Sequence, residues 1–183
     1  FDFAATGHAL CIIDSRASHA DLTDEYAAIP VEMREIAGYF GKEVLSQVPE
    51  ADFYGNVAAL RQKFGDRAVL RAYHYYQENR RVPLACQALR QGDFQRFLEI
   101  IRQSGDSSYM YLQNVSPAGA VKQQDMAITL ALCEHYLEGT GAYRVHGGGF
   151  AGTCQAFVPM EKLEAFRAGI DGVLGEGACH VLT

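Results

Sequence analysis

The sequence lacks the features that direct a protein to a membrane or to nucleic acid. It contains no apolar run long enough to span a bilayer and no visible secretory signal. Basic residues are outnumbered, because 16 Lys and Arg stand against 22 Asp and Glu and the formal net charge is −6. Nucleic acids and anionic membranes attract basic surfaces, so we expect neither as a partner.

Paired cysteines are also missing. The five cysteines are far apart, form no C-x-x-C pair, and are odd in number, which rules out a full disulfide framework within one chain. Most lie in apolar stretches, which predicts reduced, buried thiols in a cytoplasmic protein. They are Cys11, Cys86, Cys133, Cys154 and Cys179. The six histidines lack metal-ligand spacing, so no metal site is predicted.

The length allows one domain with a substantial core, or a large fragment of a bigger protein, because the chain has 183 residues of which 49% are hydrophobic. It opens at Phe1 without a methionine and stops at Thr183, inside an expected strand. We therefore expect residues 1–183 to form a single domain that belongs to a longer polypeptide.

Hydrophobic periodicity and turn residues predict the order of the elements. Strands are expected over 8–14, 142–146, 153–158 and 179–182, and helices over 23–40, 51–64 (weakly), 66–89, from 94 onward, 123–137 and 160–174. The order is a strand, a helical block, two strands, a helix and a strand. It predicts an α+β two-layer sandwich, ferredoxin-like with a long helical insertion, in which helices cover one face of a mostly antiparallel sheet.

Four positions carry more detailed expectations. Thr23 is predicted as the N-cap of the first long helix, and Pro30 is expected to be tolerated near its first turn. Pro83 is expected to kink or split the 66–89 helix. Residues 105–108 are expected to form a turn or cap, and Val173 is expected on the buried face of the last helix.

The most unusual stretch is Gly147 to Gly152, in which four of the six residues are glycines. Glycine is used where the backbone takes φ > 0 or approaches another group closely. The spacing Gly147-x-Gly149-x-x-Gly152 formally matches a dinucleotide fingerprint, but a strand follows where that fingerprint needs a helix. No Gly-Lys-Ser/Thr ending marks a Walker loop. The pattern leaves two interpretations, a hairpin turn, which it favours, and a functional loop.

Four segments in order resemble the galactokinases of the GHMP small-molecule kinase superfamily, and together they span nearly the whole chain. The segments are His19 with Glu25-Tyr26; Arg67-Ala68-x-x-Arg71-Ala72-x-His74 with Glu78-Asn79-x-Arg81-Val82; Leu89-Arg90-Gln91-Gly92-Asp93-Phe94 with Ser104; and Arg144-x-His146-Gly147-Gly148-Gly149-Phe150-Ala151-Gly152. The resemblance implies the GHMP-kinase C-terminal domain of a protein that phosphorylates galactose at the anomeric hydroxyl.

The resemblance also implies site residues and partners. Tyr26 matches a tyrosine that touches the bound sugar, although it could simply pack at a helix start. The loop of Gly147, Gly148, Gly149, Phe150, Ala151 and Gly152 matches the segment that borders the active cleft, where its N–H groups could favour phosphate. The galactose, the ATP and the Mg²⁺ of such an enzyme are partners of the complete protein.

No Gly-Leu-Ser-Ser-Ser-type phosphate loop is present. The resemblance therefore places the phosphate loop and the catalytic base on an N-terminal ATP- and sugar-binding domain outside this chain. We assign no catalytic residue here and expect the 183-residue chain alone to be inactive. If that domain docks near Tyr26 and the glycine loop, we expect an apolar surface there that is prone to self-association.

The chain departs from the family pattern in three places. Ile29-Pro30 stand where many galactokinases carry arginines, Ala151 replaces a glycine, and Thr153 replaces a cysteine. These changes leave room for a divergent subfamily that acts on another sugar, for a non-catalytic sugar-responsive regulator, or for a free-standing ligand-binding module with the same fold.

Other candidate catalytic groups have simpler interpretations. Cys154 and His146 flank the glycine loop and could suggest a Cys–His nucleophile, but Cys154 lies on an alternating strand and is predicted to be packed. His74 is explained by an aromatic-rich interior helix. Asp14 and Asp106 have no visible partner, so a strand end and a cap explain them.

Overall fold

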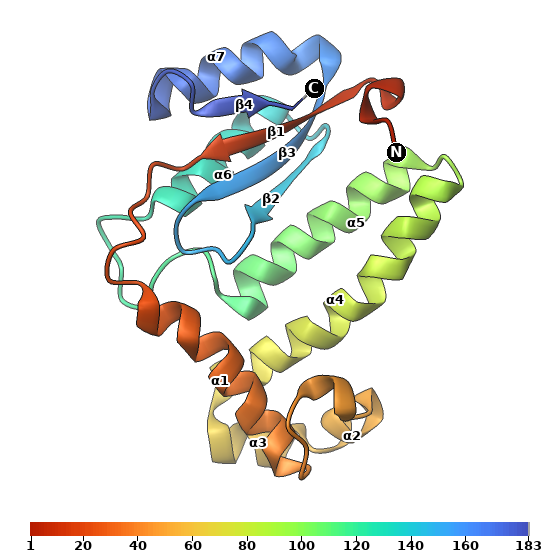
Figure 1. Cartoon of the computed structure of the whole chain (residues 1–183), viewed down its shortest axis with the longest axis vertical. Coiled ribbons are helices and arrows are strands. Elements are labelled where there is room, and N and C mark those ends of the chain that lie inside the picture. Colours follow the sequence, from red (N-terminus) through yellow and green to blue (C-terminus); the bar gives the residue numbers. More distant parts are fainter. Residues whose placement is uncertain (183) are drawn as a thin grey trace.

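The computed structural model describes residues 1–182, and among these residues four strands form one antiparallel sheet (Figure 1). The strands are β1 (His8–Asp14), β2 (Ala142–His146), β3 (Thr153–Pro159) and β4 (Cys179–Val181), in the spatial order β2-β3-β1-β4. A helical block separates β1 from β2, and helix α7 (Leu163–Leu174) connects β3 to β4. The predicted α+β ferredoxin-like arrangement with a helical insertion is confirmed.

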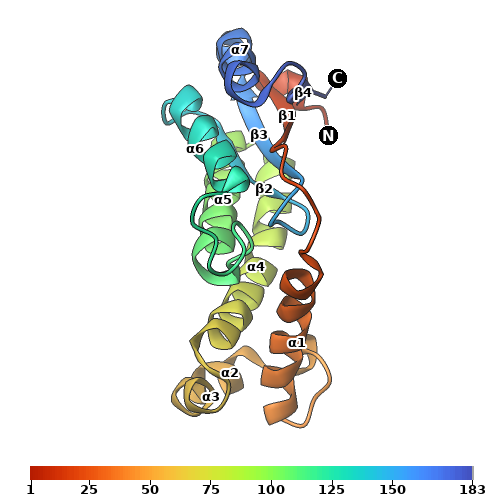
Figure 2. The same ribbon diagram turned by 90° about the vertical axis from the view of Figure 1, so that its left-hand side faces the viewer.

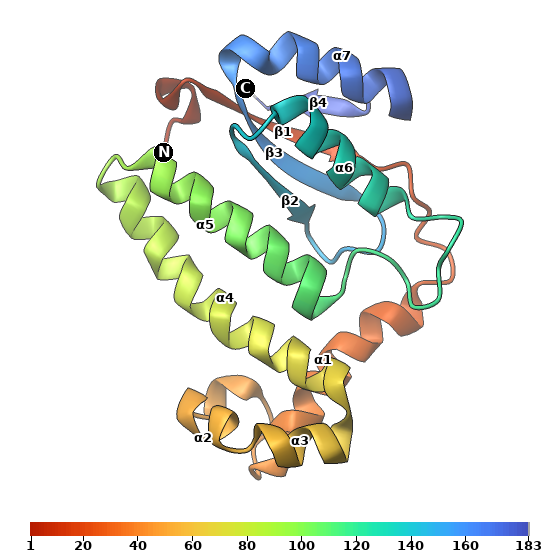
Figure 3. The same ribbon diagram turned by 180° about the vertical axis from the view of Figure 1, so that it is seen from behind.

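One face of the sheet packs against α6 (Asp125–Leu137) and α7, which lie behind the strands in Figure 1 and in front of them in Figure 3. Cys11, Ile13 and Val158 point into this core, and each is fully buried. Because side chains alternate along a strand, Phe157 points to the opposite face, where it packs against Phe97 of α5 (Phe94–Ser107). Helices therefore contact both faces of the sheet and not one face as predicted, because α5 packs against the second face.

The helical insertion extends away from the sheet (Figures 1 and 2). It contains α1 (Thr23–Tyr39), α2 (Glu50–Gly55), α3 (Val57–Phe64) and α4 (Asp66–Arg90), with α5 returning toward the sheet. A second apolar core joins α1, α2, α3 and the first half of α4 around Phe53, Leu60 and Ile36. Short 3-10 turns lie at Phe3–Thr6, Leu45–Gln47 and Met160–Lys162, and a π-helix at Ser108–Leu112.

Both prolines lie inside continuous helices. Pro30 lies inside α1 beyond the first turn, where it was not expected. Helix α4 continues through Pro83 as one helix, so a split at Pro83 is wrong, while a kink there stays a prediction. Pro83 is exposed, so water can hydrogen-bond the carbonyl that a proline leaves without an N–H donor. Thr23 is the first residue of α1 and not its N-cap, because Leu22 holds that position without a side-chain hydrogen bond.

Three further expectations are corrected. Residues 105–107 continue α5 and Ser108 opens the π-helix, so this stretch is not a turn. Val173 is exposed, because only Phe166 and Ile170 of its stripe are buried against the sheet. Cys86 is exposed on α4, whereas the other four thiols are buried as predicted.

No helix within residues 1–182 has the length and apolar character needed to cross a membrane.

Candidate functional site

The glycine loop joins β2 to β3 at the end of a hairpin, in which His146 pairs with Thr153. Gly147, Gly149 and Gly152 have φ of +79°, +83° and +90°, which residues with a Cβ rarely adopt. Phe150 also lies in the left-handed region, with φ of +58°, although it is not a glycine. The segment is therefore a hairpin connection, as the local pattern favours, and its conformation requires these glycines.

Tyr26, from the first turn of α1, contacts this loop directly. Its hydroxyl donates a hydrogen bond to the carbonyl oxygen of Gly149 at 2.8 Å, and its ring meets that of Phe150 edge-on at 5.4 Å. His19 lies on the other side, with Nδ1 3.3 Å from the same hydroxyl. The structure thus brings together Tyr26, His19 and the loop, which lie more than 120 residues apart in sequence.

The loop turns its apolar side chains inward. Phe150 and Ala151 are each 3% exposed and pack with Leu22, whereas Gly147 and Gly148 are exposed. The apolar surface expected around Tyr26 and the loop is therefore not found among residues 1–182. Bare backbone is exposed there instead, because the inward side chains close the gap between the loop and the start of α1.

Asn114 is a loop contact that the sequence did not indicate. Its carbonyl oxygen accepts a hydrogen bond from the Phe150 N–H at 2.6 Å, and its Nδ2 donates to the Gly148 carbonyl at 3.3 Å. A Cβ at Gly149 would overlap the Asn114 carbonyl oxygen. No local motif marks Asn114, because its role depends on a contact 34 residues away.

Ser15 holds the far end of the loop. Its N–H and its hydroxyl both donate to the Gly152 carbonyl, at 2.9 Å and 2.7 Å. The carbonyl groups of Gly148, Gly149 and Gly152 thus all accept hydrogen bonds from the protein. The N–H groups of Gly147 and Gly148 make no hydrogen bond to any residue within 1–182. The loop therefore presents unpaired donors on its exposed side, which suits an anionic group.

Arg67 and Arg71, the arginines of the Arg-Ala motif, bind segments next to the site and do not contact the loop itself. Arg71 is 1% exposed and donates to Glu32 Oε2 at 2.7 Å, to the Leu112 carbonyl at 2.8 Å and to the Gln113 carbonyl at 3.3 Å. Arg67 binds the other oxygen of the same carboxylate. Burial lowers the pKa of Arg71, and the hydrogen bond to Glu32 opposes this change. The cluster connects α1 to the segment that precedes Asn114.

A second polar cluster joins α4, α5 and β2. The carboxylate of Glu78 accepts hydrogen bonds from Arg81 and Ser104 and pairs with Arg144, the residue two before His146. Burial opposes ionisation of Glu78, but these hydrogen bonds and the Arg144 charge hold its pKa below the usual range. The motif residues of α4 therefore build polar contacts between elements and do not line the loop.

His74 belongs to the same cluster. Its Nδ1 lies 2.8 Å from the Ser107 hydroxyl, and its Nε2 lies 3.8 Å from Glu78. The Glu78 carboxylate alone would favour a charged imidazole. Burial and the guanidinium groups of Arg81 and Arg144 outweigh it and lower the pKa of His74 to about 4, so the ring is neutral at pH 7. His74 is therefore a buried partner of the α4–α5 contact.

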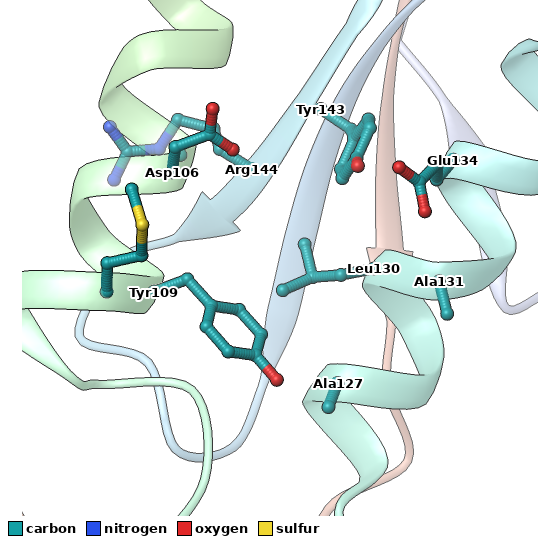
Figure 4. Close-up of a pocket in the computed structure, with 10 residues that line it drawn as sticks. Asp106, Tyr109, Ala127, Leu130, Ala131, Glu134, Tyr143 and Arg144 are labelled. Atoms are coloured by element: carbon teal, nitrogen blue, oxygen red, sulfur yellow. The ribbon is translucent and has the colours of Figure 1, made fainter. Parts of the chain in front are cut away.

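The remaining candidates are separate from the loop. Cys154 is fully buried against α6 while His146 is exposed, and burial raises the pKa of Cys154 to about 12, which leaves an inert thiol. Asp14 pairs with Arg16 at 3.1 Å. Asp106 lines a pocket of about 530 Å³ between α5, the π-helix, α6 and β2 (Figure 4).

That pocket does not include the glycine loop. Figure 4 shows the carboxylates of Asp106 and Glu134 on opposite sides of it, contributed by α5 and α6. Burial raises the pKa of Asp106, as does the charge of Glu134, and burial together with both carboxylates raises the pKa of Tyr143 to about 12. The pocket is therefore lined by the carboxyl groups of Asp106 and Glu134 and the Tyr143 hydroxyl, together with Leu130 and Tyr109.

Comparison with known proteins gives a consistent result. No protein-family model matches the chain. The galactokinase of Mannheimia succiniciproducens is 32% identical over 159 residues, which are 87% of this chain and 39% of that protein. The galactokinase of Glaesserella parasuis is 31% identical over 168 residues, covering 88% of this chain and 40% of that protein. This chain is similar to galactokinases over most of its length. It spans about two fifths of the length of the curated relatives it matches.

The solved structures agree on the fold. Lactococcus lactis galactokinase complexed with galactose superposes with a TM-score of 0.71 at 22% identity, over 96% of this chain and 45% of that one. L. major mevalonate kinase in complex with R-mevalonate gives a TM-score of 0.53 at 14% identity, over 95% and 41% of the two chains. The chain therefore shares its α+β fold with part of these two solved kinases, as the sequence resemblance predicts.

Proposed function

We propose that residues 1–183 form the C-terminal domain of a galactokinase-like enzyme, which transfers the ATP γ-phosphate to the anomeric hydroxyl of galactose. The observation that carries the proposal is the glycine loop, whose exposed N–H groups at Gly147 and Gly148 are unpaired within residues 1–182 while its carbonyl groups are bound by the protein. Phosphoryl transfer depends on positioning and on stabilising negative charge, and such a loop can form one wall of the cleft.

In this proposal Tyr26 has two roles. Its hydroxyl proton is committed to the Gly149 carbonyl, so Tyr26 first positions the loop. Its partly buried ring and the remaining lone pair of its oxygen are left to contact a sugar, with His19 alongside. The sugar would then lie against the exposed side of the loop, beside Tyr26 and His19.

The residues of this chain fit part of what ATP and Mg²⁺ require. The loop N–H groups suit phosphate oxygens, such as those of ATP, whose γ-phosphate is the group transferred. Within residues 1–182 no three His, Cys, Asp or Glu side chains are grouped as metal ligands. The proposal therefore assigns the Mg²⁺ ligands, the adenine contacts and the catalytic base to an N-terminal domain that this chain does not include, in a cytoplasmic enzyme. The 183-residue chain alone would be inactive.

The test is phosphoryl transfer from ATP to a panel of hexoses, with the complete gene product and the 183-residue chain assayed side by side. Turnover of galactose by the complete product alone supports the proposal. Turnover of a different hexose keeps the kinase assignment and changes the sugar. No turnover by either protein would favour a sugar-responsive regulator or a binding module, and turnover by the 183-residue chain would contradict the placement of the catalytic groups.

A further inference from the structure

We propose that Asn114 is the positioning residue that holds the glycine loop in its anion-accepting shape. The inference rests on the proposed function only in treating the loop as a wall of the substrate cleft. Asn114 touches the loop at three points: it accepts from the Phe150 N–H, it donates to the Gly148 carbonyl, and its own carbonyl fills the space beside Gly149.

The two hydrogen bonds act on different parts of the loop. The backbone bond at 2.6 Å fixes Phe150, whose positive φ is unfavourable for a residue with a Cβ and needs such support. The side-chain bond turns the Gly148 carbonyl toward the protein. With that carbonyl turned inward, the peptide that joins Gly148 to Gly149 is fixed and its oxygen is kept away from the exposed side, where the N–H groups of Gly147 and Gly148 are unpaired within residues 1–182. Without it, the peptide is free to rotate and present its carbonyl oxygen, which repels an anion.

The side-chain amide of Asn114 is only partly hydrogen-bonded. The residue is 2% exposed, and its Oδ1 has no hydrogen-bond partner within residues 1–182. A buried acceptor without a partner is unfavourable for folding. The fold therefore uses the NH₂ end of this side chain and tolerates the unpaired oxygen beside it, which is expected of a residue that serves a neighbouring site.

Asn114 is itself held in place by Arg71. The guanidinium binds the carbonyl groups of Leu112 and Gln113, and Gln113 adopts the left-handed conformation at φ of +56° before the chain enters Asn114. The same guanidinium pairs with Glu32 on α1, the helix that carries Tyr26. The loop is thus held from two sides, by Tyr26 and by Asn114, and both sides share the ion pair of buried Arg71 with half-buried Glu32.

The experiment measures hydrogen exchange of the loop amides in the 183-residue chain, without substrate. Asn114→Asp keeps the shape of the side chain and replaces the donor with an acceptor, so exchange should rise about fivefold or more at the Phe150 and Ala151 amides, which are hydrogen-bonded in the loop. Asn56→Asp is the matched control, because Asn56 makes the same kind of amide-to-carbonyl bond, to the Asp52 carbonyl at 2.8 Å, far from the loop. It should leave loop exchange unchanged.

A second variant and a measurement at low pH complete the test. If Asn114→Asp does not fold, Asn114→Ala serves instead, because the space that the side chain leaves lets water bind the Gly148 carbonyl, and the same rise is expected. At pH values low enough to protonate the new carboxyl, its O–H donor should return loop exchange toward the wild-type value at that pH. Loop exchange within twofold of wild type in the folded variants, or an equal rise in the Asn56 control, would overturn the proposal.

Kinetics of the complete gene product then connect this role to the reaction. We expect Asn114→Asp to lower kcat about fivefold or more with a smaller change in KM for the sugar, and Asn56→Asp to change neither. A kcat within twofold of wild type would overturn the catalytic part of the inference. A gene product without kinase activity would count against the proposed function alone, because the exchange measurement decides the position of the loop independently.

Discussion

Replacing Arg71 with methionine should be among the most damaging single changes to this protein. The side chain is 1% exposed and makes three hydrogen bonds, to Glu32 and to the carbonyl groups of Leu112 and Gln113. Methionine retains much of the apolar stem but leaves these acceptors without a donor. Glu32 retains Arg67, whose side chain is 38% exposed and cannot replace a buried partner.

The magnitude follows from burial. Removing one partner of a buried, hydrogen-bonded ion pair typically costs about 3–5 kcal/mol, a large share of the roughly 5–15 kcal/mol that stabilises an ordinary domain. For a chain of this size each kcal/mol lowers Tm by roughly 2–4 °C, so Arg71→Met should lower Tm by about 6–20 °C. The loop should loosen as well, because the segment leading to Asn114 loses its anchor.

The assay is thermal and urea unfolding followed by circular dichroism, with Arg80→Met as the matched control. Arg80 lies on the same helix and also pairs with a glutamate, Glu50, here through two hydrogen bonds, but its side chain is 61% exposed. Exposed pairs contribute little, so this variant should unfold close to wild type. Equal losses of stability in the two variants would refute the argument from burial.

Two further predictions concern the loop and the α4–α5 contact. Gly149→Ala should destabilise the protein by more than Gly147→Ala in urea unfolding. Both residues have φ near +80°, which costs roughly 1–2 kcal/mol for a residue with a Cβ. Only at Gly149 would the new Cβ also overlap Asn114. Equal losses would show that the contact with Asn114 is dispensable. The pKa of His74 is about 4 in the folded protein and near 6.5 when unfolded, so the unfolded state binds the proton more tightly. The stability contributed by neutral His74 is therefore complete above pH 6.5 and is lost as pH falls toward 4, with a slope of up to about 1.4 kcal/mol per pH unit. His74→Gln should flatten that slope in unfolding measured from pH 7 to 4, and an unchanged slope would place the titration elsewhere.

Local patterns in the sequence predicted most of the fold. The apolar run of β1, the alternation of β3 and the periodic faces of α5 and α6 are short-range signals, because burial on one face requires a fixed spacing along the chain. The positive φ of Gly147, Gly149 and Gly152 is equally local, since it follows from the absence of a Cβ. The four motifs, in order, were enough to predict the galactokinase family.

The errors arose where neighbours in space decide the outcome. The residues near Pro83 in the sequence do not show that water can bind the carbonyl that loses its N–H donor. In the same way, the spacing along α7 does not show that the buried face through Phe166 ends before Val173. The predicted apolar surface depended on which way Phe150 points, and only packing against Tyr26 and Leu22 turns it inward.

The sequence by itself predicted most of the elements, the glycine loop and the resemblance to galactokinases, because each depends on residues that are close along the chain or that match a known pattern. The tertiary structure alone decided what holds the loop. Tyr26, Asn114 and Ser15 reach it from three separate segments, and their hydrogen bonds orient its carbonyl groups and leave N–H groups exposed. Those contacts require the chain to be folded, since hydrogen bonds between distant residues leave no periodic trace in the sequence.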